Sequence, residues 1–110
     1  MRLFDTRQLS RPVIQAQVGG GAWRVKWHPD AARKQHLLAA CMHDGFKVID
    51  FDTVAATNSN TSPNWRISTR FDKHESLAYG VDWSYASTNQ EGTLVASCSF
   101  YDHSLQLWRA

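Results

Sequence analysis

The sequence has no long hydrophobic run, few cysteines and little excess charge. No apolar stretch reaches the roughly 18 residues that cross a membrane, and the first five residues, MRLFD, lack the apolar core of a secretion signal. Two cysteines are too few for a disulfide scaffold, so a reducing, cytoplasmic location is expected. Twelve Lys and Arg against ten Asp and Glu leave a formal charge of +2, which argues against a nucleic-acid or membrane partner.

Aromatic residues, by contrast, are abundant, and they mark an internal repeat. Five tryptophans are many for 110 residues. Segment 23–28 resembles 79–84, segment 38–41 resembles 95–98, and segment 46–49 resembles 105–108. The shift grows slightly along the repeat, which indicates short insertions in turns. This alignment places Cys41 and Cys98 at equivalent positions, where two small buried residues are expected rather than a disulfide or metal pair.

Every segment of the repeat has the pattern of a β-strand. Residues 23–27 and 65–71 alternate between two kinds of side chain, as a strand with two unlike faces does. Residues 37–42 form a short apolar run suited to a strand buried on both faces, and His43–Gly45 is a tight-turn signal. No stretch has a sustained helical period. The sequence therefore predicts an all-β protein built from four-stranded antiparallel units, the pattern of β-propeller blades.

The strands divide the chain, residues 1–110, into two to three blades of a partial, open propeller. Residues 1–18 supply a half blade, residues 22–71 a full blade and residues 78–109 a three-stranded last blade. Closed propellers have about four to eight blades, so a C-terminal segment of a longer protein is expected. A fragment, a splice form and a truncated gene are all open. Two polar insertions, predicted to be exposed loops, lengthen the repeat at 57–64 and 85–92.

The last unit contains the residue types of a Ser-His-Asp catalytic triad, namely His74, Ser97 and Asp102, together with Trp108. Their order favours a different interpretation, because it resembles the structural tetrad of WD40 repeats, which hydrogen-bonds across a blade. A buried carboxylate needs donors, and an imidazole and a hydroxyl supply them. Ser97 is then expected to be buried and unreactive. In the middle unit only the aspartate remains, and the other tetrad positions are taken by Val18, Ala40 and Ile49.

Turns of two neighbouring blades bring further polar residues to one face. His43 follows the second strand of the middle unit, and Tyr101 and His103 follow the second strand of the last unit. The loop with His74 and Glu75 enters a blade on the same side. Two histidines and a tyrosine there suit acid–base chemistry or the activation of water. Ordinary turn polarity and contacts with a partner are the simpler alternative.

The chain contains the strings GGAWRVKWHP, LAACMH, GFK, LAYGVDWS and CSFYDHSL followed by LW. Together these strings resemble one WD40 family, the diphthine methyltransferases of diphthamide biosynthesis. The resemblance covers residues 19–109, and its most specific parts are Tyr79–Trp83 and Cys98–His103. It implies hydrolysis of a methyl ester on the modified histidine of translation elongation factor 2, which yields diphthine. The implied partner is therefore elongation factor 2, and the implied enzyme class is a carboxylic ester hydrolase that needs no cofactor.

Ester hydrolysis needs a nucleophile and a group that stabilises the oxyanion. The sequence has no Gly-x-Ser-x-Gly elbow and no His/Cys spacing of a zinc site. From chemistry and placement, the catalytic candidates are His43, Tyr101 and His103. Either histidine would activate water, and Tyr101 would donate a hydrogen bond to the oxyanion.

A non-catalytic interaction module is the competing hypothesis, since many WD40 propellers are scaffolds. Residues 4–7, FDTR, resemble the Trp-Asp-x-Arg motif of substrate receptors for cullin-4 ubiquitin ligases, with Phe in place of Trp. In that case Asp5 and Arg7 would bind a ubiquitin-ligase adaptor instead of a substrate.

Overall fold

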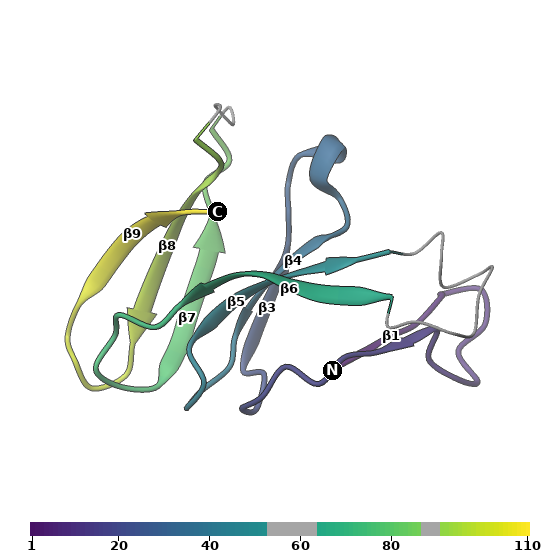
Figure 1. The fold of residues 1–110 in the computed structure, drawn as a ribbon, viewed down its shortest axis with the longest axis horizontal. Coiled ribbons are helices and arrows are strands. Elements are labelled where there is room, and N and C mark those ends of the chain that lie inside the picture. Colours follow the sequence, from purple (N-terminus) through teal and green to yellow (C-terminus); the bar gives the residue numbers. More distant parts are fainter. Residues whose placement is uncertain (53–63, 87–90) are drawn as a thin grey trace.

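Antiparallel strands are the main regular elements of the structure, a computed structural model that describes residues 1–52, 64–86 and 91–110 (Figure 1). Residues 57–63 of the first predicted insertion and residues 87–90 of the second lie outside these ranges. One short 3-10 helix, η1, spans Ala31–Arg33. The strands are β1 Arg2–Leu3, β2 Ile14–Gln15, β3 Arg24–Trp27, β4 His36–Ala40, β5 Phe46–Phe51, β6 Trp65–Phe71, β7 Ala78–Trp83, β8 Leu94–Ser99 and β9 Leu105–Arg109.

The described strands form three antiparallel sheets in chain order. β1 pairs with β2, β3 to β6 make a four-stranded sheet, and β7 to β9 make a three-stranded sheet. Neighbours in each sheet are neighbours in sequence, as in a series of propeller blades. The predicted all-β class with partial WD40 blades is confirmed. In the described ranges, no helix is long and apolar enough to span a membrane.

The two larger sheets pack face to face around the continuous apolar strand β4, which is buried on both sides. On one side Leu38 and Val48 pack against Val81 and Trp83 of the last sheet. On the other side the core includes residues of β4 and β5 together with Ile14 of the first hairpin. Leu38 is fully inaccessible to solvent, and burying such a side chain contributes about 1.5–3 kcal/mol. The apolar run that predicts a doubly buried strand therefore lies where two sheet interfaces meet.

The first strands of the two larger sheets differ in burial although their sequences are similar. In β7, Val81 and Trp83 are only 5% and 3% exposed, because they lie against the four-stranded sheet. In β3 the matching Val25 and Trp27 are 47% and 46% exposed. Val25 and Trp27 lie on the sheet face that the first hairpin covers. That hairpin packs against β4 and β5, however, and leaves the face of β3 uncovered. The alternation of β3 was predicted, whereas its exposed apolar face was not.

The strand register corrects one alignment made from the sequence. Ser97 pairs with Gln106 of β9, and Ala39 pairs with Lys47, which is the matching residue of β5. Ala39, and not Ala40, therefore takes the place of Ser97. The error arises because a shift of one residue moves a side chain to the opposite face of a strand.

The same shift separates the two cysteines, whose equivalence was wrong. Cys41 is fully buried in the core beside the first hairpin. Cys98 is partly exposed and pairs with Gly80 and Leu105 on the face of the last sheet that points away from β4. Both thiols are free.

Candidate functional site

The structure brings His74, Ser97, Asp102 and Trp108 together in one hydrogen-bonded group. The Nδ1 atom of His74 lies 2.7 Å from Oδ2 of Asp102, and its Nε2 atom lies 2.9 Å from Oγ of Ser97. Trp108 donates from Nε1 to the same Oγ at 3.1 Å. A histidine protonated on Nδ1 satisfies every member of this group, because Ser97 then donates to Nε2 and accepts from the indole.

Asp102 is held as a carboxylate by several donors. Burial raises its pKa, but hydrogen bonds from the Ser104 backbone and the His74 ring outweigh burial, so the pKa lies well below the usual range. The Ser104 backbone N–H donates to Oδ1 at 2.9 Å. The backbone N–H of Glu75 approaches Oδ2 at 3.3 Å. The loop that enters the blade and the turn between β8 and β9 are thus fixed to one carboxylate.

The group has the contacts of a catalytic triad but not its access to solvent. Ser97 is 1% exposed, and the side chain of His74 is 3% exposed. Phe46 lies 5.4 Å from the His74 ring, and Phe71 stacks on Trp108 at 4.7 Å with the two planes nearly parallel. A substrate carbonyl has no route to the Ser97 hydroxyl. The arrangement therefore joins the last sheet to the four-stranded sheet and does not form an open nucleophilic site.

The middle blade satisfies its aspartate in a different way. Asp44 binds Nζ of Lys47, whose side chain is 1% exposed, and Arg70 donates from Nη2 to Oδ1 at 3.0 Å. Lys47 also donates to the carbonyl oxygen of Val18, the residue at the position expected for the tetrad histidine. The hydrogen bond from Lys47, followed by that from Arg70, lowers the pKa of Asp44 to about 2. The sequence showed the missing tetrad residues, but the lysine that replaces them was not predicted.

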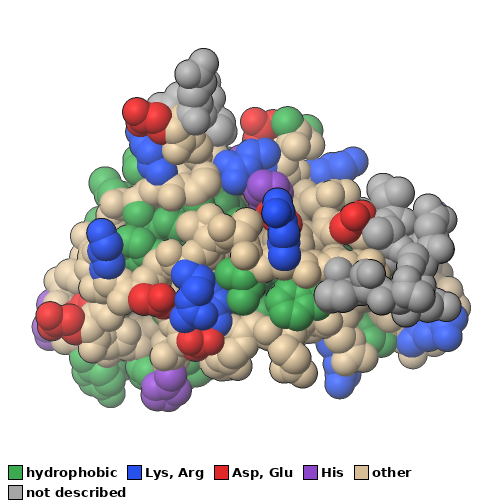
Figure 2. Space-filling model, viewed as in Figure 1, with side chains coloured by type: hydrophobic (Ala, Val, Ile, Leu, Met, Phe, Trp, Pro, Cys, Tyr) green, Lys and Arg blue, Asp and Glu red, His purple; other side chains and the backbone are tan. Residues whose placement is uncertain are grey.

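The three catalytic candidates lie on the turns at one end of the sheets. The β4–β5, β6–β7 and β8–β9 turns all lie at the lower side of Figure 1, and Figure 2 shows histidine side chains at the lower edge and at the lower left. His43, Tyr101 and His103 are all exposed. Within the described ranges, no hydrogen bond or ring contact joins any two of them. They share a face, as the repeat predicts, without forming a closed constellation.

His43 and His103 have different surroundings on that face. His43 lines a small pocket of about 100 Å³ between the two sheets, beside Phe71 and the tetrad residue His74. His103 lies in the β8–β9 turn with a φ of 53°, in the left-handed region. Gly45 occupies the matching turn position of the middle blade with a φ of 72°. Glycine adopts this left-handed backbone conformation at the lowest energetic cost, so a histidine there is locally strained. Strain of this kind accompanies functional positions.

The other predicted pair, Asp5 and Arg7, forms a two-pronged ion pair within one turn. The guanidinium donates from Nη2 to Oδ2 at 2.6 Å and from Nε to Oδ1 at 3.0 Å. The hydrogen bonds from the side chain and backbone of Arg7 lower the pKa of Asp5 to about 2. The Arg7 side chain is 86% exposed. It is therefore accessible to a partner but already held by its own neighbour.

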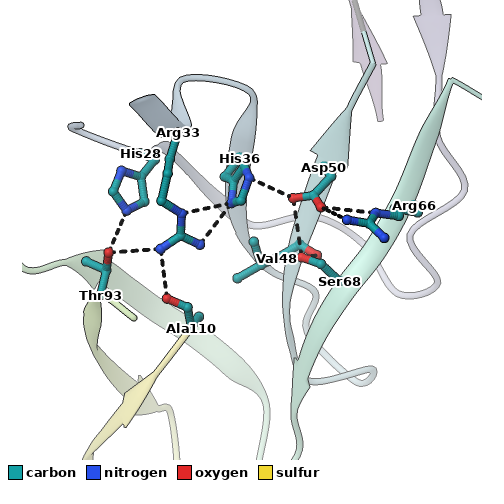
Figure 3. A network of polar contacts seen from close by, with 9 residues as sticks. All are labelled: His28, Arg33, His36, Val48, Asp50, Arg66, Ser68, Thr93 and Ala110. Atoms are coloured by element: carbon teal, nitrogen blue, oxygen red, sulfur yellow. Dashed lines mark hydrogen bonds and ion pairs between the residues drawn. The ribbon is translucent and has the colours of Figure 1, made fainter. Parts of the chain in front are cut away.

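A larger polar network at the opposite end of the sheets was missed from the sequence (Figure 3). Arg33 donates to Oγ1 of Thr93 at 3.0 Å and to the carbonyl oxygen of Ala110 at 2.9 Å, which ties η1 to the last sheet. It also approaches Nδ1 of His36 at 2.9 Å. On the other side of this ring, Nε2 lies 3.3 Å from Oδ1 of Asp50. Both ring nitrogens of His36 are thus engaged, so the network binds elements together and leaves no free base.

Two histidines of this network have lowered pKa values. Burial, assisted by the charge of Arg33, lowers the pKa of His28. Burial also lowers the pKa of His36, although the charge of Asp50 opposes it. Nε2 of His28 lies 2.7 Å from Oγ1 of Thr93. No sequence signal marks the network, because its members come from separate strands and turns and are brought together by the packing of two sheets.

In residues 1–52, 64–86 and 91–110, no group of three or more His, Cys, Asp or Glu is placed to hold a metal ion. Within each polar cluster described above, the residues are held by hydrogen bonds to one another. The turns at one end of the sheets carry side chains that suit acid–base chemistry. The network at the opposite end holds the sheets together.

Comparisons with known proteins confirm the resemblance to diphthine methyltransferases. The chain is 38% identical to a diphthine methyltransferase homolog of Dictyostelium discoideum over 98% of its own length and 29% of that protein. It is 35% identical to diphthine methyltransferase of Schizosaccharomyces pombe over 98% of the chain and 30% of that protein. It is 39% identical to the human protein over 76% of the chain and 17% of that protein. The chain thus spans less than a third of these relatives. No family model and no solved structure matches it.

Proposed function

We propose that this chain acts in diphthamide biosynthesis as part of a methyl ester hydrolase for the modified histidine of translation elongation factor 2. The observation that carries the proposal is the similarity over 98% of the chain to proteins named diphthine methyltransferase. Hydrolysis of the ester is the activity that the family resemblance implies. A cytoplasmic location follows from this proposed substrate.

In the proposed reaction, water attacks the ester carbonyl, the bond to the methoxy group breaks, and methanol leaves. His103 or His43 takes the proton from the attacking water and then gives it to the departing methoxide, which leaves as methanol. Tyr101 donates a hydrogen bond to the oxyanion that forms on the carbonyl oxygen. The exposure of all three side chains supports these roles, since a protein-borne ester reaches only the surface. The buried Ser97 takes no part.

The proposal is tested with elongation factor 2 that carries methylated diphthine. Loss of the methyl group is followed by mass spectrometry after addition of the 110-residue chain and of its His43→Gln, Tyr101→Phe and His103→Gln variants. At least one histidine variant and the tyrosine variant are expected to lower the rate by about 100-fold, the usual contribution of acid–base catalysis. Gln15→Asn, at an exposed position of β2 in the first hairpin, is the matched control. Full activity in all three variants would contradict the assigned roles.

A binding role for the first hairpin is the second candidate function, favoured by the exposure of the Arg7 side chain. Arg7 would donate to a ubiquitin-ligase adaptor after exchanging its bond with Asp5. Arg7→Ala is expected to abolish capture of a purified cullin-4 adaptor and to leave ester hydrolysis unchanged. Arg11→Ala removes the same charge from the same hairpin and serves as the control. Equal capture by both variants would exclude this role for the motif.

A further inference from the structure

Four aromatic side chains form a continuous exposed row across the two larger sheets. The row consists of Trp23, Tyr79, Phe100 and Tyr101. Ring centroids are 5.2 Å apart for Trp23 and Tyr79, 5.5 Å for Tyr79 and Phe100, and 4.5 Å for Phe100 and Tyr101. The exposed fractions are 54%, 36%, 53% and 68% in the same order. Four touching rings of this kind are far more apolar surface than scattered exposed residues provide.

The backbone holds the row in place. Trp23 directly precedes β3, and its N–H donates to the carbonyl oxygen of Ala40 at 2.8 Å. Tyr79 lies at an irregularity in the pairing of β7 with β8, between Ala78 and Gly80. Such bulges re-aim a side chain out of the regular pattern of a strand. The row therefore continues from one sheet to the other through Tyr79, which the bulge displaces. The backbone fixes the row before any ligand binds.

Positive charge adjoins the row at Tyr79. Arg24 and Lys26 of β3, together with Tyr79, line a shallow hollow of about 410 Å³. Lys26 has a distant partner, Asp82, with 3.9 Å between Nζ and Oδ2, and the two side chains are 38% and 48% exposed. The attraction between two exposed charges at such a distance is weak. Within the part of the chain that the structure describes, the Arg24 guanidinium has neither a hydrogen bond nor an ion pair.

We propose that the aromatic row and Arg24 form a binding surface for an extended protein segment that presents an aromatic side chain beside a carboxylate. Trp, Tyr and Arg are the residues that dominate the energy of protein interfaces. An unpaired guanidinium binds a carboxylate through two parallel hydrogen bonds. The rings offer faces and edges for a further aromatic ring. Acidic charge on the partner is favoured because the hollow carries two cations and one carboxylate.

A single-stranded nucleic acid also stacks on aromatic rings, but it needs a groove of cations that follows its phosphates. Two cations beside the row do not make such a groove, and the formal charge of the chain is only +2. The proposal does not depend on ester hydrolysis. It concerns a surface that reaches the candidate site only at Tyr101.

The test measures binding of the 110-residue chain to labelled, end-blocked peptides by fluorescence polarisation. One peptide alternates Phe and Glu, the second alternates Phe and Lys, and the third alternates Ser and Glu. Only the first is expected to bind measurably. Trp23→Ala, Phe100→Ala and Arg24→Gln are each expected to weaken its binding by about tenfold, the loss typical of a central interface residue.

Matched controls keep the result specific. Tyr85→Ala removes a ring that is 76% exposed but outside the row, and Arg11→Gln removes one positive charge from the first hairpin. Both are expected to bind as the unchanged chain does. Phe100→Ala, on an exposed turn, tests the row even where Trp23→Ala perturbs folding. Equal binding of the Lys peptide, no binding of the Glu peptide, equal losses in the controls, or tighter binding of an oligouridylate would overturn the proposal.

Discussion

The four-stranded sheet β3–β6 and the last sheet β7–β9 use the same strand order and the same turn aspartate, yet they stabilise it by different chemistry. In the last sheet Asp102 is bound by a buried histidine ring and by backbone N–H groups. In the middle sheet Asp44 is bound by a buried lysine and an arginine. What the turn requires is therefore a set of donors for one carboxylate, not a particular set of residues.

The largest expected effect comes from removing the indole of the last sheet. Trp108→Ala deletes the stack on Phe71 and the bond to Ser97, so it is expected to lower the free energy of unfolding by about 3–5 kcal/mol. Trp27→Ala, at a half-exposed position of the other sheet, is expected to cost less than half as much. Urea denaturation of both variants measures the difference. Equal losses would mean that the two sheets are not differently packed at these positions.

The donor set of the middle sheet is broken by Lys47→Met. The change keeps most of the apolar stem but removes the bonds to Asp44 and to the carbonyl oxygen of Val18. An expected loss of about 1.5–3 kcal/mol follows from losing hydrogen bonds of a buried charged group. NMR titration is also expected to show the pKa of Asp44 rising. Gln106→Met, at the matching position of the last sheet, is the control and should change stability by less than about 0.5 kcal/mol.

Acid is expected to weaken the junction formed by the network of Figure 3. An unfolded histidine binds a proton near its ordinary pKa of 6.5, whereas the pKa of the folded His28 is lower. Between these two values the unfolded state binds more protons, so stability decreases as pH falls through this range. The Tm is expected to drop by roughly a few degrees from about pH 7.5 to about pH 5.5. His28→Gln should reduce this drop, and an unchanged drop would assign it to other groups.

The smallest effect is a gain at the turn where the two sheets differ by His103 and Gly45. His103→Gly is expected to stabilise the chain by about 0.5–1 kcal/mol, because the residue has a left-handed φ of 53°. The reverse change, Gly45→Ala, is expected to destabilise. Its Cβ would lie 2.0 Å from Oδ1 of Asp72 at a φ of 72°. Thermal unfolding distinguishes the two signs, and a loss of stability in His103→Gly would show that the imidazole has a structural role.

Local sequence patterns predicted much of the fold, but they did not predict every polar cluster. The alternation in β6, the apolar run of β4 and the turn at Asp44 each depend on neighbouring residues, so they predicted strands at the observed places. The four residues of the tetrad were also named in advance, because their order along a blade is distinctive. The network around Arg33 could not be predicted, since Arg33 meets Thr93 and Ala110 only when two sheets pack.

The sequence by itself determined that the chain is a series of antiparallel strands, because side-chain periodicity and turn residues act over a few positions. It also determined the likeness to diphthine methyltransferases. Only the tertiary structure decided which face each residue occupies: Ala39 instead of Ala40 opposite Lys47, and Cys98 away from the core that contains Cys41. It also decided that Trp23 and Tyr79 meet in one aromatic row. Register and sheet packing set these outcomes, and both depend on contacts between segments far apart in the chain.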